Sequence, residues 1–285
     1  MSIVVTGATG HLGRLAVEGL VAAGTDPSTV VAAGRNPERL ATLASALGVR
    51  TALIDYGQPA TLEAAFAGAQ TLLFVSGSEV GQRVAQHAAV VDAAKAAGVG
   101  RVVYTSAPHA DTSELVLAPE HKATEEALRG SGLTWTILRN NWYTENYAGT
   151  LQQARATGEV VTSTGDGRVA SATRADYAAG AVAAVLGAGH ENRVYELSGD
   201  VAWSFDEFAA TASEVLGVPV VHRDVTADEQ LEILRGAGLD DGTAGFVVAL
   251  DQGIARGDLA DATGDLRTLA GRPTTPLADA LRALL

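Results

Sequence analysis

The chain has 285 residues, 47% of them hydrophobic, and no apolar run approaches the roughly 20 residues that a membrane-spanning helix requires. This composition excludes a disordered chain and predicts either one large α/β domain or a Rossmann core with a smaller lobe. The chain contains no cysteine, which excludes disulfides and thiolate chemistry, and its net charge of −13 argues against a nucleic-acid partner.

The remaining bulk properties bear on metals, location and assembly. The six histidines include no pair at i, i+4 spacing, so we expect no metal site. The N-terminal sequence MSIVVTGATG has neither a basic segment nor a cleavage site, and it is typical of a buried strand that leads into a glycine loop. We therefore expect a cytoplasmic protein with no membrane partner, and the sequence leaves open whether it forms a homodimer.

The first 140 residues alternate between apolar runs typical of buried parallel strands and segments with helical spacing. Six such units predict a doubly wound, Rossmann-type α/β fold, in which helices cover both faces of a parallel sheet. The expected strands are Ile3–Val5, Val30–Ala33, Thr51–Ile54, Thr71–Val75, Arg101–Tyr104 and Thr134–Leu138. The expected helices are Leu12–Ala23, Pro37–Leu47, Ala60–Phe66, Val80–Ala97 and Pro119–Arg129.

This regular alternation breaks after residue 139. The later expected elements are a helix over Thr173–Leu186, a strand over Arg193–Leu197, a helix from the capping box of Ser204 and Glu207 to about Leu216, and a strand-like run over Val218–Arg223. Residues 200–285 carry 15 acidic residues against 6 arginines, a net charge of −9. We therefore predict a Rossmann core at 1–142, to which 171–199 return, and a smaller, mainly helical, acidic lobe at 143–170 and 200–285.

The strongest motif is a glycine-rich loop, Gly7-Ala8-Thr9-Gly10-His11-Leu12-Gly13, which follows the first strand and opens the first helix. Glycines allow a tight turn and close approach of the backbone to a pyrophosphate, and a helix N-terminus offers free N–H groups. The spacing Gly-x-x-Gly-x-x-Gly fits extended or atypical short-chain dehydrogenases and reductases. It predicts dinucleotide binding, with contacts from Gly7, Thr9, Gly10, His11 and Leu12.

Arg35 ends the second strand, where NAD-binding folds usually place an acidic residue that holds the ribose 2′-hydroxyl. A guanidinium can instead form a fork on a 2′-phosphate, so Arg35 favours NADP over NAD; a solvated surface arginine is the alternative. Asp55 and Tyr56 follow the third strand at a position that commonly meets the adenine. An exposed turn acid is the alternative for Asp55.

Small hydroxyl residues follow the fourth and fifth strands, at the sheet edge where ligands bind in open α/β folds. Ser76, Gly77 and Ser78 would let the chain pass close to the cofactor. Ser106 would touch the nicotinamide or the substrate, or else cap a loop. These positions extend the predicted site across the sheet.

The Tyr-x-x-x-Lys proton donor of common short-chain dehydrogenases is absent, because no tyrosine here has a lysine four residues later. For example, Tyr104 is followed at that spacing by Pro108, and Tyr143 by Tyr147. The usual proton relay for alcohols and ketones is therefore missing. Quinone reduction tolerates this absence, since water can protonate the weakly basic hydroquinone oxygen.

Amide and aromatic residues gather where the sixth strand ends, in the run LRNNWYTENY at residues 138–147. Aromatic rings suit a flat substrate, and amides can orient a carboxamide or a quinone oxygen. Packing beneath the smaller lobe is the alternative for Trp142 and Tyr147. We favour participation of this segment in the site.

His121 and Tyr143 are weak catalytic candidates. His121 begins a helix and could donate a proton near neutral pH, but an exposed helix surface is the favoured interpretation. Arg174 and Asp176 open another helix, where a structural Arg–Asp pair is favoured over a role in the cleft. The catalytic residues therefore remain unknown from the sequence.

The chain resembles the NmrA-like atypical short-chain reductases and, more closely, the bacterial type-2 NAD(P)H:quinone oxidoreductases. The stretches that carry the resemblance are TGATGHLG, GRNPER, SGSEVGQRVAQH, DAAKAAGVGRVVYTS, HADTS, LRNNWYTENY, GDGRVASATRADYAAGA, VYELSGD and GRPTT, which span residues 6–275. The resemblance implies an NADPH site formed by Gly7–Leu12, Arg35, Ser76–Ser78 and Leu138, Arg139, Asn140, Asn141, Trp142 and Tyr143. It also implies a small C-terminal lobe that closes over the acceptor.

Related plant aromatic reductases use a lysine as base, and His121 stands where that lysine would lie. The sequence therefore predicts an NADP(H)-dependent oxidoreductase that transfers hydride to a quinone or related aromatic acceptor without an essential protein acid. Reduction of triphenylmethane dyes or polycyclic aromatic metabolites is an alternative. A non-catalytic NADP(H) sensor that binds a protein partner is another, and it requires a blocked nicotinamide face and an exposed apolar patch.

Overall fold

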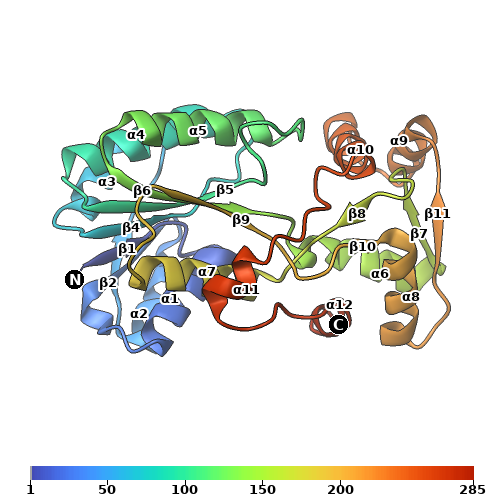
Figure 1. Ribbon diagram of the computed structural model, residues 1–285, viewed down its shortest axis with the longest axis horizontal. Coiled ribbons are helices and arrows are strands. Elements are labelled where there is room, and N and C mark those ends of the chain that lie inside the picture. Colours follow the sequence, from blue (N-terminus) through green and yellow to red (C-terminus); the bar gives the residue numbers. More distant parts are fainter. Residues whose placement is uncertain (1) are drawn as a thin grey trace.

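Seven parallel strands form the central sheet of the computed structural model, which describes residues 2–285 (Figure 1). Their order, β3-β2-β1-β4-β5-β6-β9, runs outward from β1 in both directions. This doubly wound order confirms the predicted fold class. The strands are β1 (Ile3–Val5), β2 (Val30–Gly34), β3 (Arg50–Leu53), β4 (Thr71–Phe74), β5 (Arg101–Ser106), β6 (Thr134–Asn140) and β9 (Arg193–Leu197).

Helices cover both faces of the sheet (Figure 1). On one face lie α1 (His11–Ala22), α2 (Pro37–Leu47) and α7 (Arg174–Leu186), and on the other lie α3 (Pro59–Phe66), α4 (Arg83–Ala96) and α5 (Ala118–Gly130). Asn36 caps α2 by accepting from Arg39 N–H, and a capping box of Thr173 and Asp176 begins α7. All five early helices and the helix that starts near residue 173 were thus predicted correctly to within a few residues.

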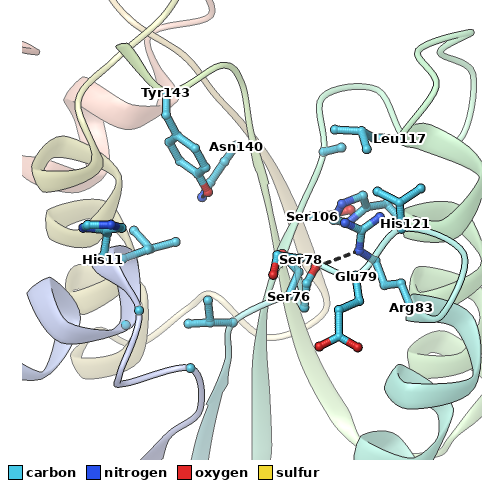
Figure 2. A pocket seen from close by; sticks show the side chains of 18 of the residues that line it. His11, Ser76, Ser78, Glu79, Arg83, Ser106, Leu117, His121, Asn140 and Tyr143 are labelled. Carbon is cyan, nitrogen blue, oxygen red and sulfur yellow. Dashed lines mark hydrogen bonds between the residues drawn. The ribbon is translucent and has the colours of Figure 1, made fainter. Parts of the chain in front are cut away.

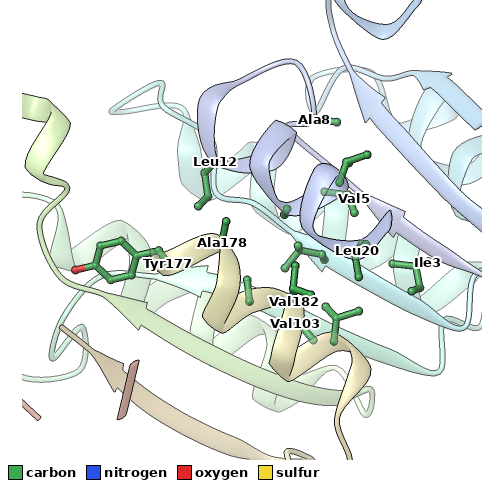
Figure 3. Packing of buried hydrophobic residues seen from close by; sticks show 14 of the residues in the cluster. Ile3, Val5, Ala8, Leu12, Leu20, Val103, Tyr177, Ala178 and Val182 are labelled. Carbon is green, nitrogen blue, oxygen red and sulfur yellow. The ribbon is translucent and has the colours of Figure 1, made fainter. Parts of the chain in front are cut away.

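Each face of the sheet has its own hydrophobic core. Figure 3 shows Leu12 and Leu20 of α1 packed against Ala178 and Val182 of α7, with Val103 of the sheet beside them. The opposite core gathers Phe66, Phe74, Val90 and Tyr104. Gly19 of α1 lies where an added Cβ would be 3.0 Å from Val182, so the two helices pack closely.

Strand β3 differs from the expectation of a buried strand. Three of its four residues are exposed, and Leu53 retains 60% of its accessible surface. The strand lies at the edge of the sheet, where it pairs only with β2. Its apolar residues indicated the strand correctly but not its exposure, because the sequence does not show which strand lies at an edge.

A second group of elements lies beside the end of the sheet at which β5 and β6 terminate (Figure 1). Its core gathers Tyr147, Trp203, Phe205, Phe208 and Ile254. Its elements are η2 (Thr144–Tyr147), α6 (Ala148–Thr157), β7 (Glu159–Thr162), β8 (Arg168–Val169), β10 (Trp203–Ser204), α8 (Phe205–Leu216), β11 (Val221–Asp224), α9 (Ala227–Gly236), α10 (Asp241–Ala255) and α12 (Leu277–Arg282). Strands β7 and β11 pair in parallel, and β8 and β10 pair antiparallel.

Helix α11 (Asp265–Ala270) returns to the large sheet, where Leu266 joins the core formed by α1 and α7. The remaining elements after residue 200 lie with the second group (Figure 1). The division into 1–142 with 171–199, and 143–170 with 200–285, stays a prediction. Within residues 2–285, no helix is both long and apolar enough to cross a membrane.

Candidate cofactor and acceptor site

A cavity of about 660 Å³ opens at the carboxyl ends of β1, β2, β4, β5 and β6. Figure 2 shows His11 and Tyr143 on one side of it and His121 and Leu117 on the other, with Ser76 and Ser78 between them. From the second group of elements, α10 contributes Phe246 and Leu250 to the lining. Its size and position are those of a ligand site in an open α/β sheet.

The glycine loop forms one wall of the cavity with an open helix terminus. Gly7 has φ of +62°, and Gly10 N–H donates to Gly7 O at 2.9 Å, which makes the tight turn. An added Cβ on Gly13 would lie 2.3 Å from Gly7 O, so α1 packs directly against the loop. In the described chain, α1 begins without a side-chain cap and without an acidic residue in its first turn. This terminus fits a pyrophosphate.

The end of β2 presents two arginines to the cavity. Arg35 is 60% exposed and forms an ion pair with Glu79, which the loop after β4 contributes. Arg39, on α2, donates from Nη1 to Thr9 O at 2.9 Å and also lines the cavity. Arg39 was not among the predicted site residues, although it lies four residues after Arg35 in GRNPER. Two cations beside the glycine loop suit a ribose 2′-phosphate.

The loop after β4 is held in place by backbone contacts. Ser76 N–H donates to Thr105 Oγ1 at 3.0 Å, and Gly77 N–H donates to His87 Nε2 at 2.9 Å. Ser76, Gly77 and Ser78 all line the cavity, as predicted from their small side chains. Asp55 and Tyr56 line it as well, but the Tyr56 hydroxyl is buried in hydrogen bonds with Thr6 Oγ1 and Val75 O.

The end of β6 contributes unpaired polar groups. Asn140 donates from Nδ2 to the Tyr143 hydroxyl at 3.1 Å, while its buried Oδ1 has no hydrogen-bond partner within residues 2–285. Trp142 Nε1 is also buried without a partner among these residues. Both residues line the cavity, and buried polar atoms are rarely left unpaired. The two unpaired atoms therefore indicate that the cavity binds a ligand with polar groups.

Tyr143 forms a second feature of this wall. Burial raises the pKa of its hydroxyl, and Arg174 lies over its ring at 4.8 Å. Arg174 pairs with Glu145, whereas Asp176 pairs with Arg272 at 2.7 Å. The favoured interpretation of Arg174 and Asp176 as a structural pair is therefore wrong, because Arg174 turns into the cavity and lines it.

Leu138 and Arg139 lie away from the cavity, whereas Asn140, Asn141, Trp142 and Tyr143 line it. Leu138 is fully buried in the core under α1 and α7. Arg139 is buried in a carboxylate cluster, where it donates to both oxygens of Glu125 at 2.9 and 2.7 Å, and it also pairs with Glu196 and Asp111. Alternate residues of a strand point to opposite faces, so Arg139 lies on the face covered by α5, opposite to Asn140.

The alternative for Tyr147 is decided by its packing, whereas the contact of Ser106 with nicotinamide or substrate stays a prediction. Tyr147 packs against Trp203, Phe205 and Phe208, so it belongs to the core of the second group. Ser106 lines the cavity but donates to Glu125 Oε1 at 2.7 Å. Its hydroxyl proton is thereby committed to the carboxylate cluster.

His121 is buried, and the favoured interpretation of an exposed helix surface is wrong. It retains 5% of its accessible surface and lines the cavity. Its Nδ1 lies 2.8 Å from the Tyr104 hydroxyl. Burial, with Arg83 beside it, lowers the pKa of its imidazolium to about 3, so at neutral pH the ring is neutral and is not a general acid.

The two buried histidines of this wall predict how stability responds to acid. Burial is the main cause that lowers the pKa of His87 and of His121 from 6.5 to about 3. Below pH 6.5 the unfolded chain therefore binds more protons, so this stability is complete above pH 6.5 and is lost as the pH falls toward 3. We expect each histidine to add a slope of about 1.4 kcal/mol per pH unit.

Urea unfolding between about pH 5 and pH 6.5 measures this slope, and His121→Gln should lower it by about 1.4 kcal/mol per pH unit. His190→Gln is the control, since His190 is only partly buried and does not line the cavity. An unchanged slope in His121→Gln would mean that His121 titrates normally in the folded protein.

These features define a dinucleotide-binding protein of the Rossmann type. The chain belongs to the NAD(P)H-binding family, whose pattern matches residues 7–186. It is 44% identical to quinone oxidoreductase 2 of Escherichia coli over 282 residues, which cover 99% of this chain and 98% of that protein. It is 32% identical over 297 residues to an NmrA-like family domain-containing oxidoreductase, flvB, of Aspergillus flavus, covering 100% and 95% of the two chains. The predicted NmrA-like, quinone-oxidoreductase-like relationship is confirmed.

Two solved structures of relatives contain the predicted cofactor. The Escherichia coli quinone oxidoreductase complexed with NADPH superposes with a TM-score of 0.94 over 99% of both chains. The triphenylmethane reductase of Citrobacter sp. complexed with NADP(H) is 39% identical, with a TM-score of 0.94 over 100% of both chains. The predicted NADP(H) cofactor is confirmed, and the glycine loop and open helix terminus of this chain fit it.

Proposed function

We propose that this protein is an NADPH-dependent oxidoreductase that reduces quinones or closely related flat aromatic acceptors. The observation that carries the proposal is the continuous cavity, which begins at the glycine loop and extends to a wall of aromatic and apolar side chains. The names of the relatives support it, since they describe a quinone oxidoreductase and a triphenylmethane reductase.

In this proposal, different residues of the cavity bind different parts of NADPH. The first turn of α1 and the glycine loop would hold the pyrophosphate, and Arg35 with Arg39 would hold the 2′-phosphate. Asn140 Oδ1, which lacks a partner within the described chain, would accept from the carboxamide of the nicotinamide. NADPH supplies the hydride when it is bound.

The part of the cavity beyond the proposed nicotinamide position is lined by aromatic and apolar side chains, as expected of a site for a flat aromatic molecule. Trp142, Tyr143 and Phe246 supply aromatic surface, and Leu115, Leu117, Leu250 and Leu259 supply apolar surface. Each turnover moves two electrons and one hydrogen to the acceptor as hydride. Water supplies the second hydrogen as a proton, giving NADP⁺ and a hydroquinone, so no strong protein acid is required.

A triphenylmethane dye is a second candidate acceptor, since a dye-reducing relative is 39% identical over the whole chain. A non-catalytic sensor role finds less support, because it requires a blocked nicotinamide face. The cavity instead continues past Asn140 and Tyr143 to the apolar wall.

A panel of quinones, triphenylmethane dyes and aromatic ketones tests the proposal by following NADPH absorbance in the presence of each acceptor. We expect the fastest oxidation of NADPH with quinones, slower oxidation with dyes, and none with ketones. Turnover confined to ketones would overturn the assignment of the acceptor class.

The two arginines predict a preference for NADPH over NADH. A charge-assisted fork on the 2′-phosphate should make NADPH bind about tenfold more tightly or better. Arg35→Asp should remove or reverse this preference, because the new carboxylate repels the phosphate. Cofactor fluorescence titrations with NADPH and NADH give the affinities directly.

Arg14→Asp is the matched control, since Arg14 lies on α1 but pairs with Glu18 and does not line the cavity. It introduces the same change of charge, and we expect it to leave the ratio of the two affinities unchanged. Equal affinities of the unaltered protein for NADPH and NADH would contradict the role of Arg35.

A further inference from the structure

Beyond binding the cofactor, the structure assigns a defined chemical state to His121. We infer that His121 acts as a neutral hydrogen-bond donor, presenting its Nε2–H to the carbonyl oxygen of the acceptor. We further infer that the backbone N–H of Gly77 fixes this tautomer through His87 and Tyr104. The inference rests on the proposed reduction of a carbonyl-bearing acceptor. It identifies the protein group that donates a hydrogen bond to the oxygen of that acceptor.

His121 is placed to meet an acceptor at the wall opposite His11 and Tyr143 (Figure 2). One ring nitrogen, Nδ1, lies 2.8 Å from the Tyr104 hydroxyl. The only hydrogen bond of the His121 side chain within residues 2–285 is this one, so Nε2 is free, and the residue retains 5% of its accessible surface where it lines the cavity. Whether Nε2 donates or accepts depends on which ring nitrogen carries the proton.

The first link that decides the tautomer is the contact between Gly77 and His87. A backbone N–H can only donate, and Gly77 N–H lies 2.9 Å from His87 Nε2, so this nitrogen accepts. A neutral His87 must then carry its proton on Nδ1. Its acceptor is Thr124 Oγ1 at 2.9 Å, whose own proton is donated to Glu120 O at 3.0 Å.

The second link is Tyr104. Its hydroxyl lies 3.5 Å from His87 Nδ1, which already carries a proton and cannot accept. The nearer nitrogen, His121 Nδ1 at 2.8 Å, is the only other hydrogen-bond partner of this hydroxyl within residues 2–285, so the Tyr104 proton is donated to it. A neutral His121 must then carry its proton on Nε2, which is the nitrogen left without a protein partner.

The surroundings keep both imidazoles neutral. The guanidinium of Arg83, from α4, lies beside the pair and is itself bound to Glu120 of α5 at 2.6 Å. Glu125, also on α5, is paired with Arg139 rather than with either histidine. The remaining facing group, Tyr104, has a pKa raised far above 10 by burial, so it stays protonated and able to donate.

A neutral donor suits the reduction of a carbonyl-bearing acceptor. Negative charge grows on the acceptor's oxygen as hydride arrives, and a fixed N–H aimed at that oxygen stabilises it. A buried imidazole with a strongly lowered pKa can polarise a carbonyl in this way without transferring its own proton. In this role His121 is a catalytic residue, and Tyr104 and His87 are positioning residues.

Nitrogen-15 NMR of the histidine rings in the full-length protein, with and without NADPH, reads the tautomers directly. We expect His121 to be protonated on Nε2 and His87 on Nδ1, with neither ring charged between about pH 5 and pH 8. Tyr104→Phe removes the hydrogen bond to His121 Nδ1, so we expect His121 to become a mixture of the two tautomers. A wild-type His121 protonated on Nδ1 would overturn the inference.

Kinetics with the best quinone test the catalytic consequence. His121→Phe should lower kcat/KM by about tenfold, the effect of losing one hydrogen bond. His121→Gln, whose amide can also donate, should recover most of that loss, and kcat should stay flat over the pH range in which His121 remains neutral. A loss in His121→Gln as large as in His121→Phe, or a kcat that titrates near pH 6.5, would contradict a neutral donor.

The pair His190–Tyr195 provides a matched control, since His190 Nδ1 lies 2.7 Å from the Tyr195 hydroxyl and neither residue lines the cavity. Tyr195→Phe should change the tautomer of His190 but not kcat/KM. The tautomer measurement does not require turnover. If no quinone were reduced while His121 still showed Nε2–H, the proposed function would fail and the tautomer assignment would stand.

Discussion

Replacing Gly10 by valine is expected to abolish NADPH binding while the protein remains folded. Gly10 precedes the first turn of α1, and its position is exposed to the cavity. An added Cβ would lie 3.3 Å from Gly7 O, which needs only a small adjustment, but the branched side chain would occupy the space of the pyrophosphate. We expect the affinity to fall by more than about 100-fold, since several charge-assisted bonds are lost together.

Gly13 provides a contrasting variant for the same loop. Its added Cβ would lie 2.3 Å from Gly7 O, so Gly13→Val should disrupt the packing of α1 and unfold the protein. Circular dichroism and NADPH titration of both variants separate the two roles. A folded Gly10→Val protein that still binds NADPH would show that the loop is only a structural turn.

Replacing Glu125 by leucine is expected to cause a large loss of stability. Glu125 is buried, and it accepts two bonds from Arg139 and one from Ser106. Removing one partner of a buried ion pair leaves the other charge poorly compensated, which costs about 3–5 kcal/mol. Urea unfolding gives the free energy of unfolding directly.

Glu126→Leu is the control, because Glu126 is the exposed neighbour on the same helix. It makes the same substitution without breaking a buried pair, and we expect a change of about 0.5 kcal/mol or less. A loss in Glu125→Leu no greater than in Glu126→Leu would mean that Glu196 and Asp111 hold Arg139 well enough without Glu125.

The sheet and its flanking helices were predictable because their local patterns are strong. The run at Thr71–Phe74 has three apolar residues after Thr71, and α2 combines Asn36 as cap, Pro37 at its first position and Gly48 after its end. The two-stranded sheets were not fully predictable. Strand β8 has two residues, and its partner β10 is 34 residues away in the chain, so no local pattern marks the pair.

The parts of the candidate site that consist of short sequence motifs were predictable. The parts that depend on the direction in which individual side chains point were not. The glycine loop and Ser76–Ser78 line the cavity as expected. The sequence did not show that Arg139 lies beneath the cavity, in the carboxylate cluster, while Asn140 and Tyr143 line it. His121 was misjudged for the same reason, because burial of one helical residue depends on the elements packed around it.

The apolar wall contributed by the C-terminal third was beyond prediction. The helix α10 contributes Phe246 and Leu250, whose spacing fits an ordinary amphipathic helix, and the loop after it contributes Leu259. Only the three-dimensional arrangement brings them to within reach of the residues that follow β6. The acceptor end of the site therefore depends on contacts that lie more than 100 residues apart in the chain.

An anaerobic single-turnover experiment tests whether the protein transfers hydride from NADPH to a quinone, by mixing the protein with one equivalent of NADPH and an excess of a simple quinone. The products are then measured by absorbance and chromatography. We expect one NADP⁺ and one hydroquinone for each NADPH consumed, without accumulation of a one-electron product. NADPH that stays bound and unoxidised with every quinone, or oxidation that releases one-electron products, would contradict this expectation.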